Sequence, residues 1–357
     1  MKKALIAMSG GVDSSVAAYL MKQAGFDCVG GTMQLCNNAL MNTSPDSDTP
    51  GDAEDAHAIA KKLGMPFYLF DHTAQFREKV VDAFVHCYEE GDTPNPCVEC
   101  NRYLKFDTLL NEALQLGCTY IATGHYAKIT KNDTTGRYLL HKAADETKDQ
   151  SYFLSFLTQQ QLAHIVFPLG ELTKEQVREI AEKQGFLTAR KRDSQDICFI
   201  PDGDYKAFLQ RYTGKQYPNG DYLDLQGNVI GRHSGAVGYT IGQRKGLGIA
   251  MGEPVYVCDK DMNRNTVTLG KDRDLYRKAL RADSWNWIPF PLLTQPISVM
   301  AKVRYRHTPQ PATVYPEENG FARVEFDEPQ RAITTGQAVV LYLGDMVIGG
   351  GRIAEVL

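Results

Sequence analysis

Long hydrophobic runs are absent from this chain of 357 residues. A membrane-spanning helix needs roughly 18 consecutive apolar residues, and no stretch of the sequence approaches that length. Lys2 and Lys3 precede an apolar run, but this run is too short for the hydrophobic region of a signal peptide. The sequence therefore predicts a cytoplasmic protein with no membrane partner.

An excess of basic residues is absent as well. Lys and Arg number 39 against 43 Asp and Glu, which gives a net charge of −4. Broad, non-specific affinity for nucleic acid needs a basic surface, so this balance argues against it, while local basic patches stay compatible with RNA binding. The sequence also has no internal repeat and no GxxxxGK[ST] pattern, which excludes a repeat protein and the commoner phosphate-binding loop.

The N-terminus does contain a strand–turn–helix unit. Residues 4–8 are apolar and predict a buried strand, residues 9–11 predict a tight turn, and residues 12–24 keep helical spacing up to Gly25. The first amides of a helix attract anions, and the serines of residues 9–15 (SGGVDSS) add hydroxyl donors, so this unit predicts a phosphate cradle. Asp13 would repel phosphate there, which predicts a Mg²⁺ ion between its carboxylate and the phosphate oxygens.

Strand and helix patterns alternate through the next hundred residues. Apolar runs at 28–35, 66–70 and 120–125 are separated by helical stretches, which predicts a parallel sheet with right-handed crossovers. Ligands of such sheets lie beyond the carboxyl ends of the strands. We therefore expect Met33 and Gly124 beside the phosphate cradle.

Two cysteines stand at CxxC spacing in residues 93–101 (TPNPCVECN), just before a helix predicted over 102–116. A thiol near a helix N-terminus has a lowered pKa, so Cys97 and Cys100 are predicted to be reactive. Cys198 follows a polar stretch farther along the chain. Three such cysteines fit either a thiol–disulfide or persulfide relay or an iron–sulfur site with an open iron position, and the pattern leaves both open.

The second half of the sequence is β-rich. Glycines crowd residues 227–252, and residues 298–357 predict short strands, with a hairpin formed by 312–315 and 321–326. Such units commonly close as barrels, and a strand predicted over 298–307 would place Lys302, Arg304 and Arg306 on one face. We predict an α/β fold of three domains: an N-terminal parallel-sheet catalytic domain (1–203), a small mixed, β-rich central domain (204–278) and a C-terminal β-barrel (279–357).

The SGGVDSS segment resembles the PP-loop of the ATP pyrophosphatases, which adenylate a carbonyl oxygen and release pyrophosphate. Nearly the whole chain resembles the bacterial tRNA-specific 2-thiouridylase family, on the segments AMSGGVDSSVAAYL, TPNPCVECNRYLKF, ATGHYAKI, KDQSYFL, DSQDICFIP, YTIGQRKGLG, KVRYRH and TTGQAVVLY. The resemblance implies a tRNA-uridine 2-sulfurtransferase. ATP would adenylate the C2 oxygen of the wobble uridine, and a protein persulfide would replace that oxygen with sulfur, releasing AMP and pyrophosphate.

The resemblance also implies a role for individual residues. Cys198 would carry the persulfide, Cys100 would be its partner nucleophile, and a transient Cys100–Cys198 disulfide would follow. The residues implied to bind ATP are Ala7, Met8, Ser9, Gly10, Gly11, Val12, Asp13, Ser14, Met33 and Gly124. Those implied to contact the target base are Asn95, Pro96 and Cys97. The remaining tRNA contacts are implied to be His125, Lys148, Asp149, Gln150, Arg304, Tyr305, Arg306 and Gln337.

Cys97 departs from part of the family, in which an Asp at this position is assigned as general base. Cys97, Cys100 and Cys198 also match the trio of the [4Fe–4S]-dependent thiolases, so sulfide bound to a cluster is an alternative sulfur source. A PP-loop C–N ligase or amidotransferase would need no essential cysteine, and a non-catalytic RNA-binding module would not need Asp13. The expected partners are tRNA and a sulfur-donor protein, either a cysteine desulfurase or a relay carrier, and the expected state is a monomer.

Overall fold

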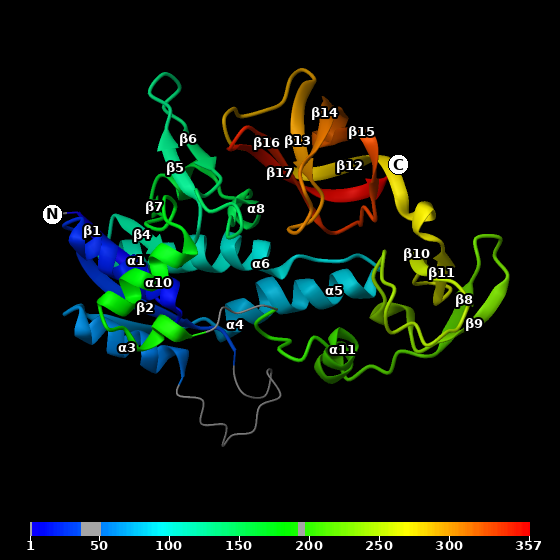
Figure 1. Cartoon of the computed structure of the whole chain (residues 1–357), viewed down its shortest axis with the longest axis horizontal. Coiled ribbons are helices and arrows are strands. Elements are labelled where there is room, and N and C mark those ends of the chain that lie inside the picture. Colours follow the sequence, from blue (N-terminus) through cyan, green and yellow to red (C-terminus); the bar gives the residue numbers. More distant parts are fainter. Residues whose placement is uncertain (1, 37–50, 192–196) are drawn as a thin grey trace.

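Three sheets organise the computed structural model, which describes residues 2–36, 51–191 and 197–357 (Figure 1). The predicted α/β architecture is confirmed: a parallel sheet comes first, a small β-rich unit follows and a closed barrel ends the chain. Within the described residues, no helix combines the length and the apolar composition needed to cross a membrane.

The first sheet is parallel and has the strand order β3-β2-β1-β4-β7. Its strands are β1 (Lys3–Ala7), β2 (Asp27–Gln34), β3 (Phe67–Asp71), β4 (Tyr120–Thr123) and β7 (Ile165–Val166). Because side chains alternate along a strand, β1 serves two cores. Ala4 and Ile6 pack with α1 (Val12–Gln23), α3 (Asp52–Lys62) and α10 (Lys174–Lys183), whereas Leu5 packs with α7 (Leu109–Gln115).

Two long helical rods extend from this sheet toward the other domains (Figure 1). The first consists of α4 (Thr73–Phe76), η1 (Arg77–Asp82) and α5 (Ala83–Glu89). The second consists of α6 (Pro96–Glu99), η2 (Cys100–Thr108) and α7. It begins at Pro96, six residues before the predicted start, because proline suits the first turn of a helix.

Shorter elements follow the fourth strand of the first sheet. They are β5 (Lys128–Lys131), β6 (Tyr138–His141), α8 (Ser151–Leu154), α9 (Gln159–Leu162), η3 (Leu187–Arg190) and α11 (Tyr205–Thr213). Strands β5 and β6 lie outside the runs for which the sequence predicts strands. The capping boxes at the starts of α9 and α10 are those that the Thr-x-x-Gln patterns in the sequence favour.

The central sheet has the order β10-β11-β8-β9. It is built from β8 (Gly220–Leu223), β9 (Val229–His233), β10 (Tyr256–Asp261) and β11 (Thr266–Gly270), with η4 (Ala236–Gly238) before its glycine-rich loop. Tyr222, Val257 and Val267 form the centre of its small core.

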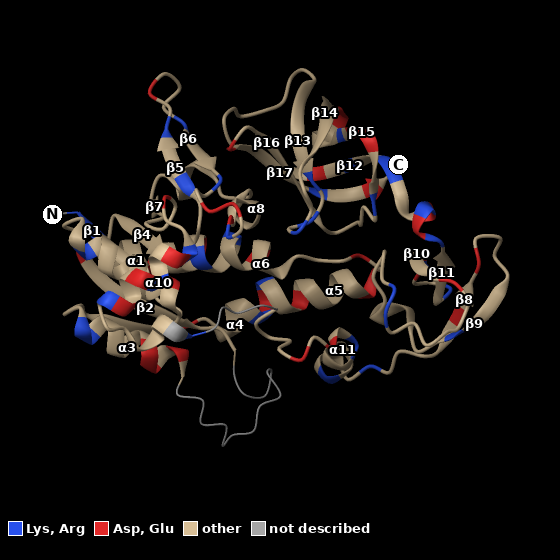
Figure 2. Ribbon diagram, viewed as in Figure 1, with Lys and Arg blue, Asp and Glu red and all other residues tan. Residues whose placement is uncertain are grey.

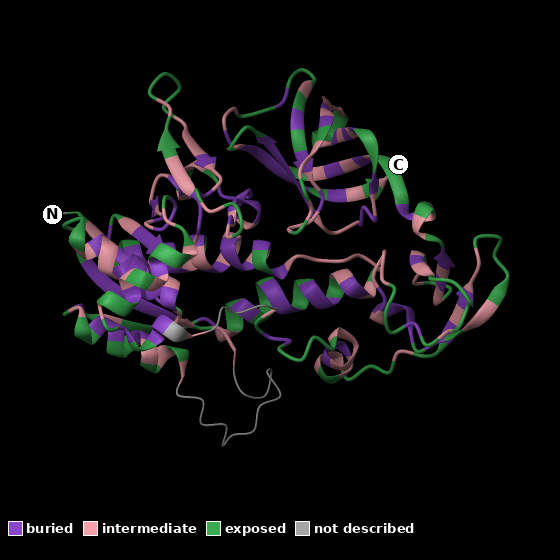
Figure 3. Cartoon of the chain, in the orientation of Figure 1, coloured by how far each residue is buried: buried purple, intermediate pink, exposed green. Residues whose placement is uncertain are grey.

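The barrel closes because β12 pairs with both β15 and β17. Its strands are β12 (Tyr276–Trp287), β13 (Ile297–Lys302), β14 (Gln310–Pro316), β15 (Ala322–Arg331), β16 (Ala338–Leu343) and β17 (Met346–Val356), with short helices η5 (Asp272–Leu275) and η6 (Glu318–Gly320). The predicted hairpin is confirmed as the β14–β15 pair. Figure 3 shows the alternation of buried and exposed residues along these strands.

One prediction about the barrel is wrong. The strand expected over 298–307 ends at Lys302, so Arg304, Tyr305 and Arg306 lie in a turn rather than on one strand face. The amide of His307 donates to the carbonyl of Arg304 at 3.0 Å and closes that turn. A second unexpected feature is that β6 joins the barrel sheet, where His141 pairs with Met346 of β17.

Candidate functional site

The predicted turn between the first strand and the first helix forms at the carboxyl end of β1. Gly10 takes a left-handed φ of +68°, and α1 begins at Val12 directly after the turn. The hydroxyl of Ser14 donates to the carbonyl of Gly11 at 3.1 Å, and the amide of Ser9 donates to the Ser14 hydroxyl at 3.2 Å. The serines of the cradle therefore stabilise the turn itself as well as lining it.

Gly124 lies against this loop from the neighbouring strand β4. A Cβ atom at Gly124 would lie 2.7 Å from the carbonyl carbon of Asp13 and 2.8 Å from the amide nitrogen of Ser14. Met33 lies near the end of β2 and is half-buried against the two cores that contain residues of the η2 and α7 rod. Strands β2, β1 and β4 are adjacent, so the residues proposed to bind ATP gather at the carboxyl ends of these strands.

Asp13 has close partners within the protein. Lys174 Nζ lies 2.7 Å from Oδ1 and 2.8 Å from Oδ2, and the hydroxyl of Tyr126 donates to Oδ1 at 2.8 Å. Both carboxylate oxygens are therefore already occupied by a cation. This arrangement does not fit the predicted Asp13–Mg²⁺ contact.

The three cysteines of interest lie in two chain segments. Cys97 is in the first turn of α6 and is exposed, Cys100 follows at the start of η2 and is buried, and Cys198 is exposed. All three are free thiols. Charge on Cys100 or Cys97 raises the pKa of Cys198, so the fold places Cys198 within electrostatic reach of both cysteines.

The expected low thiol pKa is not found at these positions. Burial raises the pKa of Cys97 and of Cys100, and it raises the pKa of Cys198 to about 12. Cys198 reaches the surface, yet protein atoms surround its thiol closely enough for desolvation to dominate. Because the helix starts at Pro96, Cys100 lies in its second turn, where the helix terminus offers little to oppose burial. Lys105 is the cation that lowers all three pKa values.

A fourth thiol, Cys36, lies just beyond β2 and packs against the core that contains Cys100. Its charge also acts on the pKa of Cys198. In the part of the chain that the structure describes, no three His, Cys, Asp or Glu side chains are arranged to hold a metal ion. Cys97, Cys100 and Cys198 as placed do not fit a [4Fe–4S] cluster, so no step is derived through one.

The loop before α6, residues 92–95, is held by the barrel. The amide of Thr93 donates to the carbonyl of Thr335 at 3.0 Å. Gln337 Nε2 donates to the carbonyls of Thr93 and Pro94 at 2.9 and 3.2 Å. Asn95, the residue before α6, hydrogen-bonds the buried hydroxyl of Tyr152, and that hydroxyl donates to the barrel carbonyl of Ala338. The position of Asn95, Pro96 and Cys97 therefore depends on the docking of the barrel.

Several residues that the resemblance assigns to tRNA have partners inside the protein. The carboxylate of the buried Asp149 accepts hydrogen bonds from Ala143 and Ser151, and Gln150 Oε1 accepts the amide of Tyr126 at 3.0 Å. His125 packs against the rings of Phe106 and Phe167, and burial lowers its pKa well below the usual value, so the ring is neutral. Lys148 is half-buried on the same connection.

The turn at 304–306 faces the same part of the first domain. The ring of Tyr305 lies 4.3 Å from that of Phe153, and Lys302 Nζ lies 5.5 Å from the Tyr305 ring. Arg304 Nη1 donates to the carbonyl of Arg331 at 3.0 Å, whereas Arg306 is exposed. Tyr305 therefore packs at the seam between α8 and the barrel, and Arg306 is exposed to solvent.

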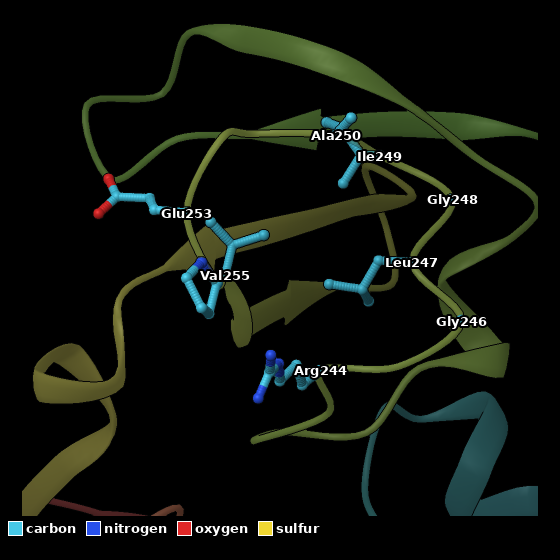
Figure 4. A pocket seen from close by; sticks show the side chains of 9 residues that line it. Arg244, Gly246, Leu247, Gly248, Ile249, Ala250, Glu253 and Val255 are labelled. Atoms are coloured by element: carbon cyan, nitrogen blue, oxygen red, sulfur yellow. The ribbon is translucent and has the colours of Figure 1, made fainter.

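Positive and negative side chains are mixed over the surface. Two hollows lie away from the predicted site residues. Figure 2 shows Lys and Arg interspersed with Asp and Glu over all three domains. A hollow of about 450 Å³ lies in the central glycine-rich loop, with Arg244 and Leu247 on its wall (Figure 4). A second, of about 440 Å³, lies between β5, β6 and the β7 region. Neither is lined by a predicted site residue.

Sequence reasoning missed Lys174, Tyr126 and Lys105. Tyr126 follows the recognised Gly124-His125 pair, and Lys105 follows Cys100 by five residues, but neither position carries a local signal. The capping box marks the start of α10, which places Lys174 at a helix N-terminus, but it does not indicate contact with Asp13.

Comparisons with known proteins cover the whole chain. Three family models match in order: the tRNA methyl transferase HUP domain at residues 2–202, the tRNA methyl transferase PRC-barrel domain at 206–271 and the aminomethyltransferase beta-barrel domain at 277–353. The chain is 47% identical over 357 residues to tRNA-specific 2-thiouridylase MnmA of Clostridioides difficile, covering 100% of this chain and 99% of the relative. It is 48% identical over 362 residues to the protein of that name in Symbiobacterium thermophilum, covering 100% and 93%.

Among solved structures, a 4-thiouridine synthetase–RNA complex with bound ATP is similar at 15% identity and a TM-score of 0.35. It covers 59% of this chain and 50% of that one.

Proposed function

Because the chain belongs to the tRNA-specific 2-thiouridylase family, we propose that it catalyses 2-thiolation of the wobble uridine of tRNA by ATP-dependent adenylation followed by sulfur transfer from a protein persulfide. The observation that carries this proposal is the pairing of two sites in one domain. The turn after β1 suits phosphate binding, and Cys100, whose charge acts on the pKa of Cys198, packs in the same core as the residues at the end of the neighbouring strand β2.

Adenylation is the first step of the proposed reaction. The C2 oxygen of uridine attacks the α-phosphorus of ATP, the bond to the β-phosphate oxygen breaks, and pyrophosphate leaves with the electron pair. The amides at the start of α1 and the Ser9 hydroxyl are the cradle donors for the phosphates. Gly124 leaves the room beside Asp13 and Ser14 that a side chain would fill.

Sulfur transfer is the second step. The terminal sulfur of a Cys198 persulfide attacks C2 and expels AMP. The Cys100 thiolate then attacks the Cys198 sulfur, the S–S bond of the persulfide breaks, and C2 keeps the sulfur. The product Cys100–Cys198 disulfide needs two electrons from an external thiol before the next cycle. Lys105 favours the thiolate form of Cys100 against the cost of burial.

The two β-rich units are proposed to hold tRNA while the first domain performs the chemistry. We propose domain limits at 203/204 and 278/279. We assign tRNA contacts to Lys148 and Arg306, whose charges both act on Tyr305 and whose side chains are half-buried and exposed, respectively, which suits phosphate binding. A sulfur-donor protein would load Cys198, which reaches the surface. The chain is proposed to act as a cytoplasmic monomer.

The test is nucleoside mass analysis of unmodified tRNA after incubation with the protein, ATP, Mg²⁺ and a persulfide source. We expect a 2-thiouridine product that is lost in Cys198→Ser and in Cys100→Ser. The matched control is Cys258→Ser, because Cys258 is a half-buried thiol of the central strand β10, outside the site. Thiolation that survives Cys198→Ser would contradict the persulfide step. ATP consumption that depends on tRNA but yields no thiolation would indicate another nucleophile, such as an amine.

A further inference from the structure

Cys36 is a thiol that the proposed reaction does not use. It lies two residues beyond β2, at the carboxyl end of the parallel sheet, and it is half-buried. Its side chain packs against the core that contains Cys100. Of the two neighbours of Cys198, Ile197 packs against the same core and Phe199 is buried in it. Three segments that are distant in the chain therefore meet at one core, and each has a cysteine in that core or next to it.

The charges of these thiols act on one another. Charge on Cys36 raises the pKa of Cys198, and this effect ranks after that of Cys100 and before that of Cys97. Charge on Cys100 in turn raises the pKa of Cys36. Because such effects weaken with distance, Cys36 lies within electrostatic reach of both cysteines of the proposed product disulfide.

Cys36 differs from Cys100 in its access to solvent. Cys100 is only 8% exposed, whereas Cys36 is half-buried and Cys198 is exposed. A disulfide is reduced when a thiolate attacks one of its two sulfurs, so the rate depends on which sulfur an incoming thiol can reach. In a Cys100–Cys198 disulfide only the Cys198 end reaches the surface. A Cys36–Cys198 disulfide would offer two reachable sulfurs.

We propose that Cys36 is a resolving thiol, which takes over the product disulfide from Cys100 and presents it to an external reductant. This assignment rests on the proposed function. The Cys36 thiolate attacks the Cys198 sulfur, the Cys36–Cys198 bond forms and the Cys100–Cys198 bond breaks. The electron pair of the broken bond goes to the Cys100 sulfur, which takes up the proton that Cys36 has lost. Two molecules of an external thiol then reduce the new disulfide and are themselves joined as a disulfide.

Proximity is what makes this exchange feasible. Burial raises the pKa of Cys36 to about 12, so little of its thiolate forms at neutral pH. A disulfide held beside it in the same protein is attacked intramolecularly, with an effective concentration far above that of a free thiol. Cys36 should therefore exchange with its neighbours in the fold and react slowly with small molecules in solution.

Oxidation of the protein without tRNA tests the pairing. The thiol-specific oxidant diamide is added to Cys100→Ser, and peptides are analysed by mass spectrometry without reduction. We expect a disulfide between Cys36 and Cys198. Trypsin leaves Cys36 in one peptide with Cys28, residues 23–61, so fragment ions must assign the linked cysteine. A link from Cys198 to Cys97 or Cys28 in place of Cys36, or no link at all, would overturn the proposal.

Thiolation kinetics test the role of the pairing. Cys36 acts after the sulfur has left, so persulfide-loaded Cys36→Ser should give the wild-type yield in a single turnover without reductant. With glutathione as the reductant, repeated turnover of Cys36→Ser should slow about twofold or more, because one reachable sulfur remains instead of two. The Cys100–Cys198 disulfide should accumulate in this variant. Cys258→Ser is the matched control, since Cys258 is also half-buried but lies on β10, and it should match the wild type in both assays.

The remaining outcomes separate this proposal from the proposed function. A lower single-turnover yield in Cys36→Ser would overturn the proposal, because Cys36 would then act before the sulfur leaves or only maintain the site. Wild-type rates of repeated turnover in Cys36→Ser would overturn it as well, while leaving the thiolation reaction supported. Protein that forms the Cys36–Cys198 disulfide but does not thiolate tRNA would support the thiol pairing and contradict the proposed function.

Discussion

Gly336 offers a test of how the barrel controls the loop that carries Asn95. The residue has a left-handed φ of +81°, and a Cβ there would lie 2.9 Å from Asp92 Cβ, 3.0 Å from the Thr93 nitrogen and 3.1 Å from Cys87 Sγ. Gly344, in the turn between β16 and β17, has a φ of +62° and nothing within 4 Å of its Cβ position. Alanine at either site carries the left-handed strain, but only Gly336→Ala collides with the first domain.

The expected loss of stability has two parts, the strain of a left-handed alanine and the collision with the first domain. Left-handed alanine costs about 1 to 2 kcal/mol at both positions. Overpacking adds about 1 to 3 kcal/mol at Gly336 alone. We expect the strain at Gly336 to be relieved by moving residues 92–95 away from the barrel. This movement weakens the hydrogen bond from the Thr93 amide to the Thr335 carbonyl, which is 3.0 Å long.

Hydrogen exchange followed by mass spectrometry measures this opening directly. Each 1.4 kcal/mol changes an equilibrium constant tenfold, so exchange in a peptide covering residues 92–97 should be roughly 5- to 150-fold faster in Gly336→Ala. Gly344→Ala should leave that peptide unchanged while lowering the melting temperature. Thiolation should slow in Gly336→Ala more than in Gly344→Ala. Equal exchange in the two variants would refute the reasoning that the barrel positions the loop.

Three further expectations concern titrating groups. Because burial raises the pKa of Cys198 to about 12, its alkylation by iodoacetamide should accelerate about tenfold per pH unit from pH 7 to 10. Lys105 lowers the pKa of Cys198, so Lys105→Met should slow that alkylation at every pH. An unchanged rate would show that Lys105 does not act on the Cys198 thiol. His307 accepts the Val303 amide, and burial lowers its pKa to about 4. The unfolded state therefore takes up a proton first, and the melting temperature should fall below pH 6.5 more steeply in the wild type than in His307→Asn. Lys260 Nζ forms no hydrogen bond with any described residue, and burial lowers its pKa to about 8. The stability of the wild type should therefore rise from pH 8 toward about 10.4. The variant Lys260→Met should not show this rise, and it should be more stable than the wild type at pH 7. Parallel pH curves for wild type and variant would contradict either of the last two expectations.

The parallel sheet and the barrel strands could be predicted because their signals are local. The apolar run of residues 4–8, the turn at Gly10 and the helix that follows lie within one short segment, and the hairpin around residues 317–320 is equally compact. The prediction of a strand through Arg304 was wrong because a turn begins after Lys302. Its alternating pattern extends past Lys302, but the turn closed by His307 uses the backbone groups that a strand would need.

The candidate site could be predicted only in part. The sequence indicates which cysteines matter, but their acidity depends on burial by residues distant in the chain, so the predicted low pKa of Cys100 was wrong. The contact between Asp13 and Lys174 joins residues 161 positions apart. No local pattern encodes such a contact. It requires the order of the strands and the angle at which α10 packs against α1.

The β5–β6 hairpin has a consequence for synthesis on the ribosome. His141 pairs with Met346, and Arg137 Nε donates to the carbonyl of Ile288 at 2.8 Å, so the hairpin is completed by residues translated about 150 to 200 positions later. At roughly 5 to 20 residues per second, the nascent first domain waits about 10 to 40 seconds for that partner. During this interval β6 is an open edge, and its shortness, together with Lys128 and Lys131 on β5, limits pairing with other nascent chains. Fragments that stop before the barrel should therefore need a chaperone more than the full chain does.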